Sequence, residues 1–138
     1  MTQQVEAKYV NEWILLNYPD RLYWKRVHLG PLPKKDLARL YKVTQRWIDA
    51  VIKDHDKVLL VEAKLVPRPD AVGQLLLYND LFSQTEMFKE LWDWPRQMVL
   101  LTTREDRHVR ALCEEHNIKY EVYAPPWVLE YLAKRYRR

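Results

Sequence analysis

Residues 58–65 read Val58-Leu59-Leu60-Val61-Glu62-Ala63-Lys64-Leu65, an apolar run that contains two charges. The run is rich in valine and leucine and too short for an independent helix, so it predicts a buried strand. Side chains alternate across a strand, so Glu62 and Lys64 point to the same face. Charges on a buried face are costly unless they are paired, hydrogen-bonded or bound to a metal. A carboxylate and an ammonium in one recessed place therefore indicate a metal site with a cationic helper.

The composition is that of a folded protein, with 48% hydrophobic and 30% charged residues in a chain of 138. This length predicts a single domain over residues 1–138. No stretch approaches the roughly 18 apolar residues of a membrane-spanning helix, and no secretory leader opens the chain. The single cysteine, Cys113, excludes an internal disulfide and a cysteine-built zinc site. We therefore expect a cytoplasmic protein with no membrane partner, and the net charge of +4 mildly favours a polyanionic one.

The first half of the chain predicts a helix followed by three strands. The expected elements are a helix over 3–17, strands over 21–28, 41–52 and 58–65, and a polar turn over 53–57. The turn between the last two strands makes them an antiparallel hairpin.

The second half predicts alternating helices and strands. Asp70 is a candidate cap for a helix over 70–83, and residues 86–92 extend that helix or form a second short one. A helix over 104–116 places Cys113 and His116 on its apolar stripe. Strands over 98–102 and 118–123 and a last helix from residue 127 complete the order. The fold class is therefore α/β: a mixed central sheet, made of an antiparallel hairpin with parallel β-α-β additions and flanked by helices.

Asp49 lies on the strand that precedes the hairpin turn. A turn centred near residue 55 pairs Asp49 with a position near Val61, within one residue of Glu62. Two carboxylates at adjacent strand positions can share Mg²⁺, which prefers oxygen ligands, and the backbone carbonyl of Ala63 is a further candidate ligand. Lys64 beside them can orient or deprotonate a water, or steady charge growing on a phosphate oxygen.

These residues resemble the PD-(D/E)xK nuclease superfamily, which includes RecB-type nucleases and archaeal Holliday-junction resolvases. The matching elements are Asp49, then Glu62-Ala63-Lys64, then Gln74-Leu75-Leu76-Leu77-Tyr78, which is similar to the QxxxY motif of the RecB-like branch. An acidic residue on the first helix is also usual in that superfamily, and Glu6 matches it better than Glu12. Ile48 stands where the motif's name has proline.

The resemblance implies a restriction-endonuclease-like core and a role for each matching residue. Asp49 and Glu62 would bind Mg²⁺ or Mn²⁺, with Ala63 as a further ligand, and Lys64 would be the catalytic lysine. The three helical residues Glu6, Gln74 and Tyr78 would complete the catalytic site, the last two from one face of a helix.

Structural alternatives stand beside these roles. The tripeptide is common and occurs again as Glu6-Ala7-Lys8 in a helical setting, so only its strand context is informative. Glu62 and Lys64 could be cross-strand partners on a solvated face, and Asp49 could form a structural ion pair with Lys64 or Arg46. The three helical residues could be ordinary surface or core side chains.

Basic residues near the predicted site could contact phosphates, which supply most of the sequence-independent affinity for DNA. The candidates are Lys34, Lys35, Arg46 and Arg68. The leading hypothesis is a Mg²⁺-dependent nuclease, cutting inside DNA or from an end. The alternatives are a catalytically inactive nucleic-acid-binding or assembly subunit with the same fold, and a nuclease acting on RNA. A homodimer and a subunit of a larger nucleic-acid-processing complex both agree with the sequence.

Overall fold

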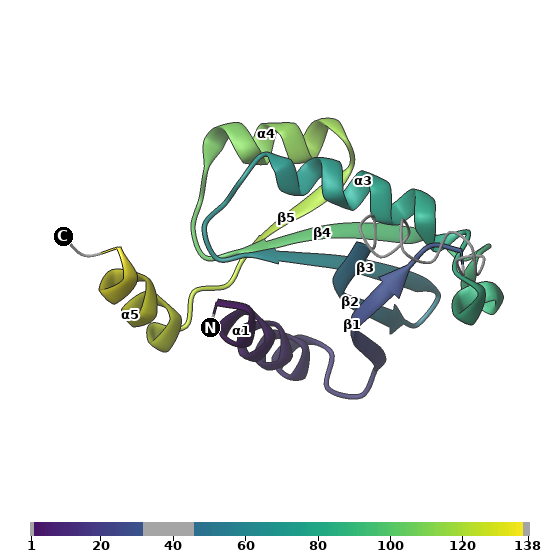
Figure 1. Cartoon of the computed structure of the whole chain (residues 1–138), viewed down its shortest axis with the longest axis horizontal. Coiled ribbons are helices and arrows are strands. Elements are labelled where there is room, and N and C mark those ends of the chain that lie inside the picture. The colour runs from purple at the N-terminus through teal and green to yellow at the C-terminus, as the bar shows by residue number, and fades with distance from the viewer. Residues whose placement is uncertain (1, 32–45, 137–138) are drawn as a thin grey trace, which may run out of the picture.

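A single five-stranded sheet organises the chain in the computed structural model, which describes residues 2–31 and 46–136 (Figure 1). Its strand order is β1-β2-β3-β4-β5. The first two pairings are antiparallel and the last two are parallel, as predicted. The strands are β1 (Leu22–Leu29), β2 (Arg46–Asp54), β3 (Lys57–Lys64), β4 (Arg96–Thr102) and β5 (Ile118–Val122).

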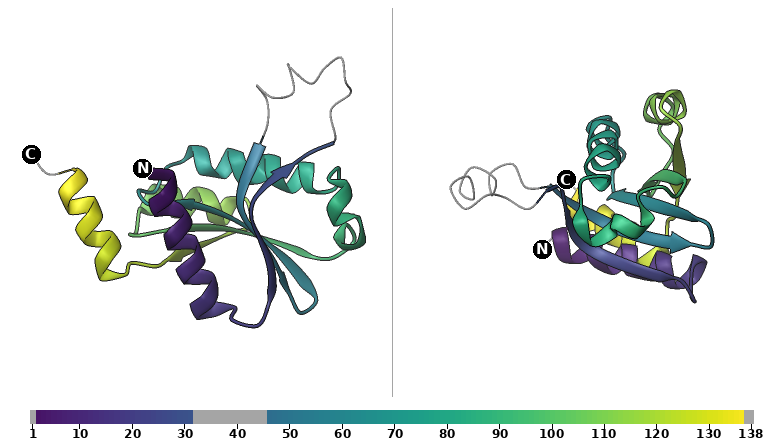
Figure 2. Two further views of the ribbon diagram at one scale, coloured as in Figure 1. Left: turned by 60° about the horizontal axis from the view of Figure 1, so that its bottom comes forward. Right: turned by 90° about the vertical axis from the view of Figure 1, so that its right-hand side faces the viewer.

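Helices cover both faces of this sheet. α3 and α4 lie over one face, and α1 lies against the other with α5 beside one end of it (Figures 1 and 2). The helices are α1 (Thr2–Asn17), α3 (Asp70–Phe82), α4 (Arg107–Glu115) and α5 (Pro126–Arg135), with a short 3-10 helix η2 (Glu86–Leu91) after α3. Within the described residues, no helix has the length and apolar character needed to cross a membrane.

Each face of the sheet has its own apolar core, and the strand alternation decides which side chains join it. On β3, Val58 and Leu60 belong to the core beneath α3 and α4, whereas Leu59, Val61 and Ala63 belong to the core against α1. Val58 through Ala63 are all at most 5% exposed, so β3 is buried on both faces. Glu62 comes two residues after Leu60, so its side chain points to the same face of the sheet, the face that α3 covers.

The hairpin turn is shorter than the predicted five-residue turn. Strand pairing continues to Asp54 opposite Lys57, which leaves only His55 and Asp56 in the turn. His55 has a φ of 56°, the left-handed conformation that closes such a tight hairpin. The side chain of Asp54 accepts a hydrogen bond from Arg21 Nε at 2.8 Å, which holds the polar end of β2 in the ladder.

Two helix starts and one core assignment also differ from prediction. Asp70 is not a cap, because Pro69 occupies that position and the Asp70 carboxylate pairs with Arg68 at 3.0 Å. α4 begins at Arg107, since Asp106 caps it by accepting hydrogen bonds from two backbone amides at 3.0 Å. His116 follows the helix and is exposed rather than part of the core.

Candidate active site

The two charges that interrupt β3 lie together near its C-terminal end. Lys64 Nζ is 3.6 Å from Glu62 Oε2, which is within ion-pair distance. Glu62 is 5% exposed, whereas the Lys64 side chain is 20% exposed and reaches a cavity. The pair therefore does not lie on a solvated sheet face.

Asp49 is positioned by the hairpin register. Ala50 pairs with Val61, so the preceding residue on β2 comes opposite Glu62. The backbone amide of Ala63 donates a hydrogen bond to Asp49 Oδ2 at 2.8 Å. Strand geometry and this bond bring the two carboxylates together, as the sequence predicts. Among the described contacts, Asp49 forms no ion pair with Lys64.

Glu62 is a buried carboxyl group that lies beside a second carboxylate, that of Asp49. Burial removes water from the group, and the Asp49 carboxylate beside it shares a hydrogen bond with it. Both effects favour the protonated form and raise the pKa of Glu62 to about 10, although Lys64 opposes the shift. A cation bound between the two carboxylates would replace this proton.

Glu6 joins the site from α1, and Glu12 does not. The pKa of Glu6 is raised chiefly by burial and then by the charge of Asp49, while Lys64 and Arg26 lower it. Glu6 and Lys64 also line one cavity. Glu12, further along α1, instead accepts hydrogen bonds from Tyr123 and Trp127.

Gln74 and Tyr78 approach from α3. Tyr78 is 4% exposed and its hydroxyl donates a hydrogen bond to the Trp47 carbonyl at 3.1 Å, two residues before Asp49. Tyr78 therefore fixes the part of β2 that carries Asp49. Gln74 Oε1 is buried and has no hydrogen-bond partner within the described part of the chain.

Of the four basic residues that we predicted to contact phosphates, only Arg68 has a side chain within the described residues. Lys34, Lys35 and the side chain of Arg46 lie outside the described residues. Arg68 follows β3, lines the cavity that contains Glu6 and Lys64, and pairs with Asp70. It therefore lies close to the candidate site, where we expected it.

Thr102 is a residue that the sequence interpretation did not single out. It pairs with Lys64 across the parallel β3–β4 ladder, is fully buried, and its hydroxyl has no hydrogen-bond partner among the described residues. The only sequence signal is a threonine at the end of a predicted strand, which is too ordinary a feature to indicate a site.

The donor set fits a hard divalent cation. Within residues 2–31 and 46–136, no group of three or more His, Cys, Asp or Glu side chains is arranged to hold a metal. Mg²⁺ does not need such a group, since it is commonly bound through one or two carboxylates and keeps several waters. Asp49 and Glu62 supply two, and Glu62 Oε1 is a buried acceptor without a partner among the described residues.

Comparison with solved structures assigns the class of fold. A repair endonuclease from Pyrococcus abyssi superposes with a TM-score of 0.56 at 18% identity, over 88% of this chain and 47% of that one. A chain of an EndoMS–double-stranded DNA complex matches with a TM-score of 0.52 at 16% identity, over 85% and 44%. The fold predicted from the sequence is confirmed, and it is the fold found in these endonucleases.

A third similar structure is a protein of unknown function, AF1548, with a TM-score of 0.52 at 13% identity, over 83% of this chain and 55% of that one. The chain thus spans about half the length of the solved proteins it matches. No protein-family model matches the sequence, and no curated protein does.

Proposed function

We propose that this chain is a metal-dependent nuclease that hydrolyses DNA phosphodiester bonds, with a site of the PD-(D/E)xK type. The observation that carries the proposal is the convergence of Asp49, Glu62 and Lys64 at one end of the β2–β3 hairpin. Glu6 approaches them from a helix far away in the sequence. Glu62 is buried and the other three side chains are only partly exposed, and withdrawing so many ionisable groups from water is costly unless it serves a site.

Each residue has a role that its surroundings support. Asp49 and Glu62 would hold Mg²⁺ or Mn²⁺, with the Ala63 carbonyl as a further ligand, while the Ala63 amide orients Asp49. When bound there, the cation supplies positive charge that polarises the scissile phosphate and favours attack by water. Lys64 would donate a hydrogen bond to the attacking water or to a phosphate oxygen. Tyr78 holds the backbone of β2 in place.

The similar structures support DNA as the substrate in this proposal. One is a repair endonuclease and another is a complex with double-stranded DNA. The net charge of +4 agrees with a polyanionic partner. Together with the site, these observations favour DNA as the substrate of this chain.

Cleavage assays with an Asp49 variant test this function. Wild-type protein is incubated with supercoiled, linear, branched and single-stranded DNA in Mg²⁺ or Mn²⁺, and cleavage is followed on gels. Asp49→Asn should lower the rate by roughly a hundredfold or more, because even partners one step removed from a metal contribute about 10–100-fold. Asp56→Asn, on the exposed hairpin turn, is the matched control and should cut at the wild-type rate. Failure to cut any substrate, or equal cutting by Asp49→Asn, would refute the proposal.

A second candidate is a catalytically inactive subunit that binds nucleic acid or supports assembly. The net charge of +4 agrees with binding of a polyanion whether or not the chain cuts it. DNA binding that weakens with salt, is insensitive to EDTA and gives no turnover would identify this function. Parallel assays with RNA of the same sequence would detect a ribonuclease.

A further inference from the structure

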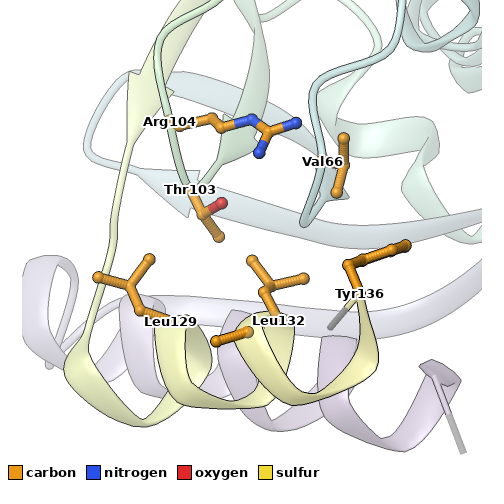
Figure 3. A pocket seen from close by; sticks show the side chains of 7 residues that line it. Val66, Thr103, Arg104, Leu129, Leu132 and Tyr136 are labelled. Carbon is orange, nitrogen blue, oxygen red and sulfur yellow. The ribbon is translucent and has the colours of Figure 1, made fainter. Parts of the chain in front are cut away.

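A large cavity lies between α5 and the segments that follow β3 and β4. Its volume is about 490 Å³, which is within the range of cavities that hold small molecules. Figure 3 shows Leu129 and Leu132 pointing from α5 toward Thr103 and Arg104, with Val66 and Tyr136 at the side. The lining is therefore chiefly apolar, with an arginine on one wall.

This cavity adjoins the candidate active site. A neighbouring cavity of about 240 Å³ is lined by Glu6, Lys64 and Arg68. The two cavities share Val66, Leu132 and Tyr136 as lining residues. An occupant of the larger cavity would therefore lie next to a group bound at Lys64.

The charge around the two cavities is mostly positive. The cationic lining residues are Lys64, Arg68, Arg104 and Arg135, against one acidic residue, Glu6. Arg68 is paired with Asp70, whereas Arg104 makes no ion pair within the described residues. An apolar cavity with a cationic margin suits a ligand that has a flat apolar part attached to an anion.

The walls of the cavity are held by contacts that need no ligand. The Thr103 hydroxyl donates a hydrogen bond to the Leu65 carbonyl at 2.6 Å, which joins the segments after β3 and β4. Trp127 at the start of α5 donates to the Glu12 carboxylate at 2.9 Å, which fixes that end of the helix to α1. The cavity is thus preformed, which lowers the cost of binding.

We propose that this cavity binds one unstacked nucleobase of the DNA substrate, with the adjoining phosphate beside Lys64. The inference rests on the proposed nuclease function and deepens it, since it names DNA with an unpaired nucleotide as the favoured substrate. Leu129, Leu132 and Tyr136 contact the faces of the base, and Arg104 contacts the backbone. An unpaired base is favoured because little pairing and stacking energy is lost when it leaves the helix.

Binding assays in EDTA test the proposal separately from cleavage. Three duplexes of one sequence are compared by fluorescence anisotropy: fully paired, with one unpaired nucleotide, and with an abasic residue at that position. We expect the unpaired duplex to bind roughly tenfold more tightly than the other two, which is the scale of one base stacked on side chains. A 2-aminopurine at the unpaired position should change its fluorescence on binding.

A cavity-filling variant identifies the place of binding. Ala133 lines the cavity on the exposed side of α5, so Ala133→Trp should remove the roughly tenfold preference for the unpaired duplex. The matched control is Ala111→Trp, which adds the same side chain to the exposed face of α4. Circular dichroism of both variants checks that they are folded.

Several results would overturn the inference. They are equal affinity for the three duplexes, no binding of any DNA, and equal effects of Ala133→Trp and Ala111→Trp. Failure of the nuclease proposal is a separate result, because a protein that cuts nothing can still show the preference. Cleavage without any preference for the unpaired nucleotide would retain the nuclease and reject the nucleobase cavity.

Discussion

Glu12 on α1 and Glu62 on β3 both carry a carboxyl group, and the surroundings of the two groups are opposite. Glu12 accepts hydrogen bonds from Tyr123 and from Trp127, which lowers its pKa. Glu62 is buried beside another carboxylate, which raises its pKa, and its Oε1 has no partner among the described residues.

The difference separates a carboxylate that stabilises the fold from a carboxyl group whose burial destabilises it at neutral pH. Glu12 joins α1 to Tyr123 after β5 and to Trp127 at the start of α5, so its carboxylate has partners within the protein. Glu62 Oε1 has no such partner among the described residues, and its burial lowers the stability of the fold at neutral pH. Substitution of each residue by glutamine should therefore change the stability of the protein in opposite directions.

The largest effect on cleavage is expected from substitution of Lys64, which forms an ion pair with Glu62. Lys64→Met should lower the cleavage rate by about 10²–10³-fold, the scale of a positioned proton donor or acceptor. The metal concentration for half-maximal activity should change little, because Lys64 is not a metal ligand. Rates measured across a metal titration check both points.

Lys57→Met, at the exposed start of the same strand, is the control and should retain full activity. Recovery of the Lys64→Met variant at high metal concentration would instead assign Lys64 to metal binding.

Glu62→Gln should stabilise the metal-free protein at pH 7, by about 1–4 kcal/mol, because folding of the wild type must place a proton on Glu62 and folding of the variant need not. The folded wild type keeps a proton on Glu62 up to a pKa of about 10, whereas the unfolded chain releases it above about 4.5. Wild-type stability should therefore fall as pH rises between these values, and the slope should be smaller in the variant. Urea unfolding in EDTA at pH 5, 7 and 9 measures the free energy of unfolding and its slope with pH.

The exposed Glu130 provides the control, since Glu130→Gln should keep the wild-type slope. Identical slopes in Glu62→Gln and wild type would show that Glu62 is ionised in the folded protein.

Glu12→Gln should have a smaller effect of opposite sign, a loss of about 1–2 kcal/mol from weakened hydrogen bonds to a charged group. Because the folded pKa of Glu12 lies below 4.5, its contribution is complete above that pH and is lost as pH falls through the folded value. The difference in unfolding free energy between variant and wild type should therefore shrink below pH 4.5. Cleavage per folded molecule should not change.

Glu115→Gln, on the exposed side of α4, is the comparison for this variant and should be neutral. A stabilised Glu12→Gln would contradict the contrast between the two carboxyl groups.

The sequence predicted the fold because its signals are local and repeated. The apolar run of β3 and the β-α-β alternation after it determine the strand order, and the structure has that order. Alternation of side chains also placed Glu62 and Lys64 on one face, and the hairpin brought Asp49 to them.

The features that could not be predicted from the sequence depend on contacts between distant segments. The hairpin turn was predicted too long because Arg21, which binds Asp54, is 33 residues away. Glu12 was the second choice after Glu6 for the acidic residue of the first helix, but Tyr123 and Trp127 donate hydrogen bonds to it. Thr102 reaches the site only through pairing of β4 with β3, which no local pattern encodes.

The hydrogen bond from the Ala63 amide to Asp49 couples strand alignment to activity. If β3 shifted by one residue against β2, Glu62 would turn to the α1 face, and this amide would no longer reach the Asp49 carboxylate. Such a chain would still contain a hydrogen-bonded hairpin, yet it would have no site. The fraction of active molecules in a preparation should therefore equal the fraction whose hairpin folded in the correct alignment.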